Sequence, residues 1–436
     1  MTPEPARAAS TAEDPPPPRP RIPAPTEPAD DPAGGPARPT ASERPTGSER
    51  PAGSERPAGS ERPAGSEPSA RFQPPGRAPR PRGGRSGADR RAGGGPLRFA
   101  VVVAGLLLAL AAAVIASLAL GSVRIPPGQV LDALTGRAAD PSPYRTIVLD
   151  VRLPRVLLGA VVGAGLAVVG AVLQALVRNR LADPFLLGIS SGASAGAVLV
   201  LVAGGGAGLV GGVTTTLAMP AGAFAGALLA LVLVYGLARR GGTLTSTRLV
   251  LAGVAVSYIL SALATLLLVV AGRPEQFQEA VHWSLGGLGS ARWDTLVLPA
   301  AVLAVGTAAL LTLARPLDLL LVGEEDATIL GLDTARFRAA VFVLASLVTA
   351  VMVAASGAVG FVGLMAPHAA RLAVGAPHRR LLPVAALGGA LALVLADLAA
   401  RTVAAPQDVP VGILTALTGG PFFLWLMRRR PEGAQP

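Results

Sequence analysis

The 436-residue sequence contains no cysteine and no lysine, and both absences restrict its chemistry. Without cysteine there can be no disulfide, thiolate metal site or cysteine nucleophile. Without lysine the chain cannot form a P-loop, because that motif places a lysine on the nucleotide phosphates. Aromatic residues are also scarce, at 4% of the chain. Because the chain lacks the lysine of a P-loop, a partner must hydrolyse any ATP on which the protein depends.

Hydrophobic residues make up 51% of the sequence and charged residues only 15%, although the first part of the chain is polar. The remainder therefore has the composition of a membrane protein. The net charge of +11 comes from arginine, and no nucleic-acid-binding motif accompanies it. We interpret these arginines as loop residues that follow the positive-inside rule, and we predict no nucleic-acid partner.

Residues 1–96 are rich in proline, alanine, glycine and arginine, and one SERPTG and three SERPAG hexads repeat between Ser42 and Gly65. Such a segment cannot bury enough apolar surface to fold, so we predict a disordered tail. It has no early apolar stretch and therefore does not resemble a secretory signal. Arginines that precede the first apolar run predict a cytoplasmic N-terminus.

From Leu97 onward, apolar runs of about 20 residues, the length that spans a bilayer, recur with short interruptions. We predict an all-α polytopic membrane domain over 97–430 with about ten transmembrane helices. They are expected at 97–120, 154–177, 187–206, 213–238, 248–272, 294–315, 338–358, 361–371, 382–401 and 409–428. Threaded from a cytoplasmic start, this topology places the arginine-rich loops and both termini inside.

Glycines recur at the spacing that permits close helix packing. Gly159 and Gly163 form one such pair, and Gly222 and Gly226 form another. The stretch from Gly357 to Pro383 combines glycines with Pro367. Proline removes a backbone donor, which a membrane tolerates only where protein or a cavity satisfies the freed carbonyl. We therefore expect a helix that breaks at Pro367 inside a bundle.

The same stretch, GAVGFVGLMAPHAARLAVGAPHRRLLP, resembles the family motifs G-x-[IV]-G-F-[IV]-G-L-x-x-P-H-x-x-R and H-R-x-L-L-P. The family is that of the FecCD-like permease subunits of type II ATP-binding-cassette importers for iron(III)-siderophores, haem and cobalamin. Similar motifs follow the family order from Leu97 to Arg430. The resemblance implies a permease in the cell membrane with no cofactor of its own. Its implied partners are ATPase subunits, an extracytoplasmic binding protein and a second permease, in a homodimer or heterodimer.

The segment RLPR at 152–155 precedes the second predicted span on its outer side and matches a family motif. In the family these arginines dock acidic residues of the binding protein, which implies that role for Arg152 and Arg155. Asp397 and Arg401 lie on one helix face and match A-D-x-x-A-R, which adds Arg401 to the docking surface. Simple anchoring of the helix end and a structural Asp397–Arg401 ion pair remain the alternatives.

Two segments resemble the halves of the family's cytoplasmic gate. In QALVRNRLADP, which begins at residue 174, Asn179 and Leu181 match positions that narrow the pathway, while Arg180 replaces the usual proline. The segment TSTRLVLAGV, which begins at residue 245, implies that Ser246 and Thr247 form the other half. A hydroxyl at a helix start is more commonly an N-cap, so capping is the alternative.

The segment GEEDATILGL at 323–332 lies in a predicted inner loop. Its acidic start and its closing glycine predict a short amphipathic helix. The family's G-x-x-x-A-x-x-L-G segment is a coupling helix that inserts into the ATPase subunit, and a solvated loop helix is the alternative. The positions matched to the coupling motif are Gly323, Glu324, Ala327, Leu330 and Gly331.

The three histidines, His282, His368 and His378, have no acidic or histidine partner at the spacing of a metal site or a catalytic triad. We therefore predict no metal site and no enzymatic activity. The resemblance favours a permease subunit for iron(III)-siderophores, with cobalamin or haem as alternative substrates. An ion-gradient-driven secondary transporter is the alternative from another class, and it would place ionisable groups at mid-membrane.

Overall fold

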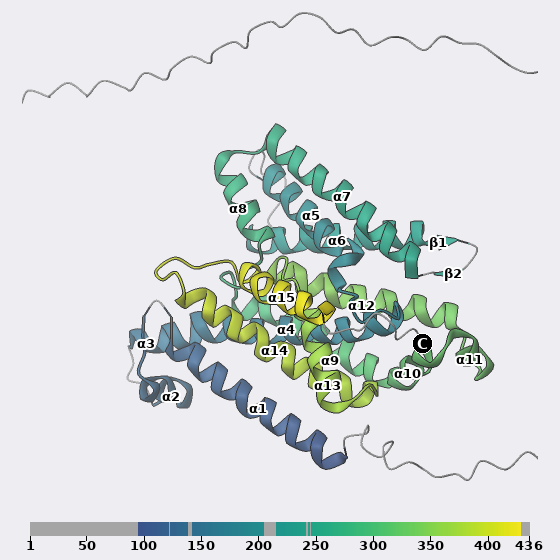
Figure 1. Cartoon of the computed structure of the whole chain (residues 1–436). Helices are drawn as coiled ribbons and strands as arrows, with labels where there is room; N and C mark the ends of the chain where they lie inside the picture. Colours follow the sequence, from purple (N-terminus) through teal and green to yellow (C-terminus); the bar gives the residue numbers. More distant parts are fainter. Residues whose placement is uncertain are drawn as a thin grey trace, which may run out of the picture. The chain divides into compact units, whose positions relative to one another are not determined.

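The structure is a computed structural model, and it describes residues 95–428 apart from 122, 138–141, 205–214, 241–242 and 245. The predicted N-terminal tail lies outside the described residues, so its disorder stays a prediction. The described part is helical except for two short paired strands (Figure 1). The elements are α1 (Pro96–Ala119), α2 (Pro127–Thr135), α3 (Pro143–Thr146), π-helical η2 (Ile147–Arg152), α4 (Leu153–Leu176), 3-10 helix η3 (Pro184–Leu187), α5 (Ile189–Gly204), α6 (Thr215–Ala238), β1 (Arg239–Arg240), β2 (Thr243–Leu244), α7 (Ser246–Ala271), α8 (Pro274–Ser284), α9 (Trp293–Thr312), α10 (Ala314–Val322), α11 (Glu324–Ile329), α12 (Thr334–Ser356), α13 (Val362–Val374), α14 (His378–Thr402) and α15 (Val411–Arg428).

Each of the ten predicted spans corresponds to a helix in the described part of the chain, and the all-α fold class is confirmed. Seven helical stretches there are long and apolar enough to cross a membrane. Helices α5 and α15 are apolar but shorter, and α13 has 13 residues. The number of membrane crossings therefore stays a prediction, whereas the positions of these helices along the chain are confirmed.

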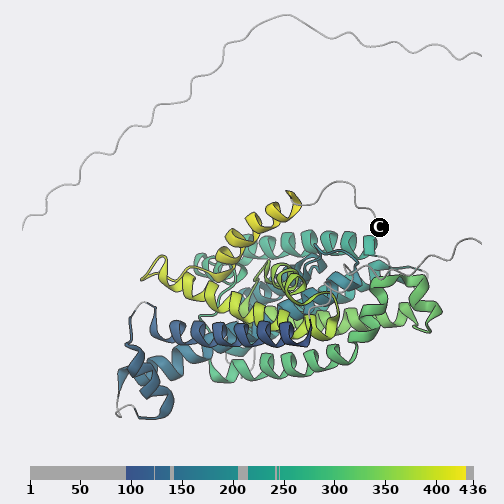
Figure 2. The same cartoon turned by 60° about the horizontal axis from the view of Figure 1, so that its bottom comes forward.

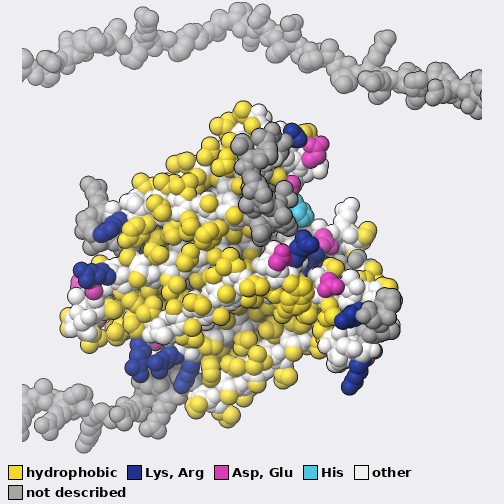
Figure 3. Space-filling view, turned by 180° about the vertical axis from the view of Figure 1, so that it is seen from behind, with side chains coloured by type: hydrophobic (Ala, Val, Ile, Leu, Met, Phe, Trp, Pro, Cys, Tyr) yellow, Lys and Arg dark blue, Asp and Glu magenta, His cyan; other side chains and the backbone are white. Residues whose placement is uncertain are grey.

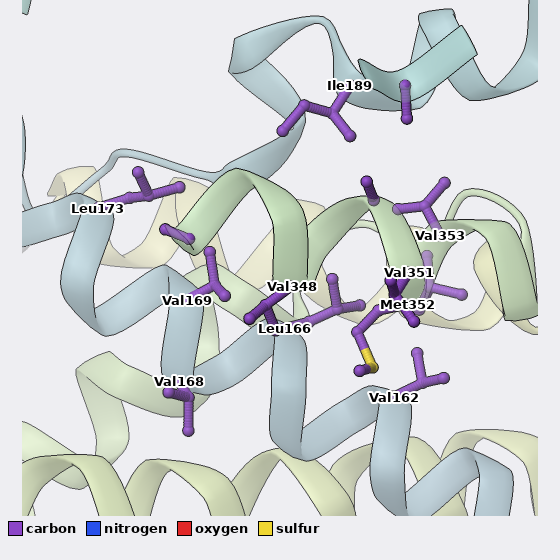
Figure 4. Packing of buried hydrophobic residues seen from close by; sticks show 14 of the residues in the cluster. Val162, Leu166, Val168, Val169, Leu173, Ile189, Val348, Val351, Met352 and Val353 are labelled. Atoms are coloured by element: carbon purple, nitrogen blue, oxygen red, sulfur yellow. The ribbon is translucent and has the colours of Figure 1, made fainter. Parts of the chain in front are cut away.

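Helix α4 lies at the centre of the bundle. Within its most apolar window 83% of residues are buried, compared with 6% for α1 at the periphery. Figure 4 shows the resulting core, in which Val162 and Leu166 of α4 lie near Val348 and Met352 of α12. The exposed helices leave an apolar belt between two ends that bear charged side chains (Figure 3). This distribution fits a protein whose sides contact lipid or another apolar partner.

Glycines bring the helix backbones of this core into direct contact. The backbone of α4 meets α14 where Gly163 faces Gly389, and it meets α13 where Gly170 faces the carbonyl oxygen of Gly363. Helices α5 and α6 make equivalent contacts, in which Gly222 and Gly226 participate. A Cβ atom at these glycines would overlap the neighbouring backbone, so the predicted close packing of Gly163, Gly222 and Gly226 is confirmed.

The predicted break at Pro367 is wrong, because α13 continues through this proline to Val374. The interruption lies earlier, between Gly357, with φ 66°, and Phe361, with φ 67°. Helical geometry pairs the residue at 367 with the carbonyl of Gly363, and proline cannot donate that bond. That carbonyl instead faces the bare backbone of Gly170, where a weak Cα–H contact is available.

The segment RLPR also differs from its prediction, because it does not precede a helix. Helix α3, the π-helical segment η2 and α4 form one continuous helical stretch from Pro143 to Leu176. Pro154 has no backbone N–H to donate. The π-helical segment ends at Arg152, directly before α4 begins. Both arginines of the motif therefore project from a helix that is already inside the bundle.

The described bundle has two ends with different contents (Figures 1 and 2). One end bears α2, α3 and the connection between α14 and α15, and we call it the α2 end. The other bears α10, α11 and the paired strands, and we call it the α11 end. The predicted docking residues lie at the α2 end, whereas the predicted coupling residues lie at the α11 end.

We expect Gly170→Ala to destabilise the folded bundle by about 1–3 kcal/mol, because the added methyl group overlaps the backbone of α13. The measurement is the thermal unfolding and the monodisperse yield of the full chain in detergent. Gly105→Ala in α1 is the matched control, because no atom lies within 4 Å of the Cβ position there. Equal behaviour of the two variants would contradict the proposed backbone contact.

Candidate functional site

Charged side chains from α4, α14 and the following connection form one cluster at the α2 end. Arg155 Nε lies 2.9 Å from Asp397 Oδ1, and Arg155 Nη1 lies 2.7 Å from Asp408 Oδ2. Arg401 Nε lies 3.0 Å from the second oxygen of Asp397 and forms an ion pair with it, although the two atoms are not aligned for a hydrogen bond, so one buried carboxylate pairs with two arginines. A carboxylate that is taken out of water in this way needs such partners.

The other guanidinium contacts of this cluster go to main-chain carbonyls of the last turn of α1 and of the loop that follows it. Arg152 donates to Leu118 O at 2.6 Å and to Val123 O at 2.5 Å. Arg401 donates from both terminal nitrogens to Ser117 O at 3.2 Å. The carbonyls of Ser117 and Leu118 lie in the last turn of α1, where the backbone lacks intrahelical donors, so the arginines cap that end.

We call Arg152, Arg155, Arg401, Asp397 and Asp408 together the arginine cluster. Only 5% of Arg152 and 6% of Arg401 is exposed, and 14% of the Arg155 side chain. The structural Asp397–Arg401 ion pair is therefore present. Docking of a binding protein is not tested by this geometry and stays a prediction, and Arg155 is the best placed of the three arginines to take part.

An open cavity of about 620 Å³ adjoins the arginine cluster between the end of α1 and the end of α14. Its lining is mostly apolar, with Arg124 as its charged member. Gly121 also lines it, and a Cβ atom there would lie 3.0 Å from Arg152 Nη2. Glycine at this position therefore leaves the buried guanidinium close to the cavity wall.

At the α11 end, residues 178–182 form the turn that follows α4, which we call the gate turn. Arg178 has φ 53°, a left-handed conformation that is uncommon for a residue with a side chain. The Asn179 side-chain oxygen accepts from Leu181 N at 2.9 Å, and the Asn179 carbonyl accepts from Ala182 N at 3.0 Å. The turn thus closes through asparagine although Arg180 replaces the family's proline.

Asp183 connects this turn to the interruption before α13. The backbone N–H groups of Phe185 and Phe361 donate to its carboxylate. Desolvation by the surrounding protein nevertheless raises the pKa of Asp183 from 3.8 to about 6, against the lowering effect of these hydrogen bonds. A second hydrogen bond joins α4 to α13 directly, because Gln174 of α4 accepts from Arg371 of α13 at 2.9 Å.

The other predicted half of the gate lies at the start of α7. Helix α7 begins at Ser246, and the Thr247 side chain is exposed. Helix η3, which follows Asp183, contacts α7, and Gly188 at its end approaches the carbonyl of Gly253. The structure therefore places η3, which follows the gate turn, against α7 about two helical turns beyond Ser246 and Thr247. The role of the two predicted segments as a gate stays a prediction.

The predicted coupling segment forms a short helix, as its sequence indicated. Helix α11 starts after Gly323 and ends in a left-handed Gly331 with φ 87°. Leu330 is 65% exposed, whereas Ala327 is fully buried within this chain. Ala327 is therefore unavailable to a partner and can only hold the helix in place. A contact with an ATPase would have to use the exposed face.

One titratable pair escaped the sequence analysis. His378 Nδ1 lies 2.5 Å from Asp318 Oδ1, although 60 residues separate the two. No spacing rule links α10 to the start of α14, so the pair could not be found without the fold. Among the described residues, no group of three or more His, Cys, Asp or Glu side chains gathers where it could hold a metal ion.

The fold and its apolar belt (Figure 3) are those of a polytopic membrane protein. The profile of the FecCD transport family matches residues 107–429, and the chain belongs to this family. It is 43% identical to the cobalamin import system permease BtuC of Halobacterium salinarum, over 66% of this chain and 75% of that protein. It is 39% identical to the hemin transport permease HmuU of Yersinia pestis, over 66% and 84% respectively.

A solved structure of a similar transporter agrees with this family assignment at the level of the fold. It is an inward-facing conformation of a transporter described as of the metal-chelate ABC type. The TM-score is 0.65 at 30% sequence identity, and the alignment covers 76% of this chain and all of the other. The helix arrangement is therefore that of an ABC transporter permease.

We expect the stability of the wild-type chain, relative to Asp183→Asn, to rise as the pH falls from about 7 to about 4. The folded pKa of about 6 exceeds the reference value of 3.8, so the folded state binds more protons between these values. The measurement is the apparent unfolding temperature of both proteins across this range. Parallel curves would show that Asp183 has no raised pKa.

Proposed function

We propose that this chain is the transmembrane permease subunit of an ATP-binding-cassette importer that takes up iron(III)-siderophores. The observation that carries this proposal is α11, a short helix at one end of the bundle with an exposed Ile329 and Leu330. The arginine cluster lies at the opposite end, where a substrate-delivery protein would bind. An ATPase at α11 and a binding protein at the cluster would then act on the same helices.

The substrate class follows from the relatives, and the site geometry does not select among its members. The relatives are named for cobalamin and hemin, and the solved structure for metal chelates. Their common chemistry is a large organic chelate with a bound metal ion. We choose iron(III)-siderophores within this class, with cobalamin and haem as the alternatives.

A secondary transporter is the alternative from another class. It would place ionisable groups near mid-membrane to bind the coupling ion. The buried ionisable side chains of the described residues are Arg152, Arg338, His378, Asp397 and Arg401, and the desolvated carboxylate of Asp183 at the start of η3 joins them. They lie in the arginine cluster or near helix starts at the α11 end, which supports the importer.

Reconstitution tests the proposal directly. The full chain with its ATPase subunit and binding protein, in proteoliposomes, should accumulate an iron(III)-siderophore only when ATP is supplied. Uptake driven by an ion gradient without ATP would support the secondary transporter instead. Uptake of cobalamin or haem but not of the siderophore would keep the importer and replace its substrate.

A second permease is also proposed, because two helices leave large apolar side chains exposed. Helix α7 exposes Tyr258 by 76% and Val270 by 76%, and α15 exposes Leu417 by 67%. Lipid or a second copy could cover them. The mass of the detergent-solubilised complex distinguishes a dimer, as proposed here, from a single permease.

We expect Leu330→Asp to weaken assembly with the ATPase at least about tenfold, because a carboxylate would be buried in an apolar contact. The bundle should remain folded, since Leu330 is 65% exposed. The matched control is Leu134→Asp in α2, an exposed leucine at the opposite end. Both assembly and substrate-stimulated ATP hydrolysis should be measured. Normal assembly of the Leu330 variant would remove the coupling assignment.

For docking, we expect Arg155→Gln to weaken the affinity of the binding protein at least about tenfold. Three guanidinium groups face two carboxylates in the arginine cluster, so an acidic partner would balance the excess positive charge. Glutamine is preferable to glutamate, which would face Asp397 and Asp408 and unbalance the cluster itself. The control is Arg292→Gln at an exposed arginine. Equal affinities for the two variants would contradict docking at Arg155.

A further inference from the structure

The cavity of about 620 Å³ beside the arginine cluster lies between the end of α1 and the end of α14, two helices that contact each other (Figure 1). Its volume falls within the range of about 300–1,000 Å³ that is usual for ligand sites. Leu395 and Thr402 both line it and lie on the same helix, so the cavity extends along about 10 Å of α14. Leu120, Leu398 and Ala399 make most of the remaining wall apolar.

The wall formed by Gly121 and Arg124 is positively charged. Arg124 has an exposed side chain, and no acidic residue of the described part of the chain lines the cavity. Behind Gly121, a Cβ atom would lie 3.0 Å from Arg152 Nη2 and 3.6 Å from Arg401 Nη1. The two carboxylates of the arginine cluster pair with Arg155 and Arg401, whereas Arg152 donates to main-chain carbonyls. An anionic group in the cavity would therefore meet positive charge that no carboxylate neutralises.

The surroundings of the cavity are apolar and exposed, which distinguishes it from a site for a soluble anion. Leu120 and Leu395 in its wall are 41% and 46% exposed, and Val123 and Val403, the sequence neighbours of lining residues, are 47% and 72% exposed. Helix α1 is itself peripheral, with 6% of its most apolar window buried. The cavity therefore joins the apolar belt to the charged α2 end. Cations beside exposed apolar side chains match the phosphate group and the acyl chains of a membrane lipid.

We propose that this cavity binds an anionic phospholipid, with the phosphate group at Arg124 and an acyl chain along Leu395 and Leu398 of α14. A guanidinium group binds phosphate through charge-assisted hydrogen bonds, and Arg152 adds positive charge from behind Gly121. The hydrogen bonds of Arg152 to the end of α1 remain in place. A lipid bound in this way would hold the exposed helix α1 against α14. The site requires neither the transported substrate nor an ATPase.

Native mass spectrometry of the full chain in detergent tests the site, with phosphatidylglycerol as the probe. The wild-type chain should retain phosphatidylglycerol in preference to zwitterionic phosphatidylcholine, and equal retention of the two lipids would overturn the proposal. Arg124→Gln should weaken the retention of phosphatidylglycerol about fivefold, the usual contribution of one arginine to the binding of anionic lipid. The matched control is Arg137→Gln, which changes an exposed arginine at the same end that does not line the cavity. Equal retention by these two variants would also overturn the proposal.

Ala399→Phe separates a lipid in the cavity from a lipid held by a surface arginine, because it fills the cavity and changes no charge. It should reduce the retention of phosphatidylglycerol at least as strongly as Arg124→Gln, and unchanged retention would overturn the proposal. An equal concentration of inorganic phosphate should leave the lipid bound, and displacement by phosphate would assign a free-anion site instead. If Arg124→Gln weakened the binding protein's affinity but not lipid retention, the cavity would belong to the docking surface and the proposal would fail.

Discussion

The backbone contacts of α4 are the constraint on which the other features depend. Gly163, Gly165 and Gly170 place this helix against α14, α12 and α13 in turn, and Met352 Sδ would lie 2.8 Å from a Cβ atom at Gly165. Because the contacts at Gly163 and Gly170 are made by backbone atoms, they allow little sliding. They fix the register that brings Arg155 of α4 opposite Asp397 of α14, and Gln174 of α4 opposite Arg371 of α13. One rigid helix therefore bears the arginine cluster at one end and the gate turn at the other.

The sequence predicts the helices well because their signal is local. Apolar length places the ten apolar helices that were predicted as spans, and the acidic start and final Gly331 predict α11, whereas the shorter α2, α3, α8 and α10 were not predicted. The same reasoning fails where the local backbone structure depends on a contact with a residue that is distant in the sequence. Pro367 does not break its helix, because its unpaired carbonyl partner faces the bare backbone of Gly170. The motif at 152–155 lies within a helix, because a π-helical segment extends it.

Side-chain partners are the least predictable feature of the site. The charge rule assigns arginines to a side of the membrane but does not say whether they are buried, and Arg152 is buried by carbonyls at the end of α1. Glu324 and Glu325 are equivalent in sequence, and only the packing of α11 against α12 turns the first of them towards Arg338. The His378–Asp318 pair joins helices that are adjacent only in the folded bundle.

The two ends of α4 differ in how firmly they are held, and this difference bears on mechanism. At the α2 end, two carboxylates and three main-chain carbonyls hold the arginines, and breaking a buried ion pair costs about 3–5 kcal/mol. At the α11 end, a short turn that contains Arg178 in a left-handed conformation is closed by the side chain and the carbonyl of Asn179. A helix that is fixed at one end and weakly closed at the other concentrates conformational change at the weak end. At that end the few hydrogen bonds that close the turn can open without unfolding the bundle.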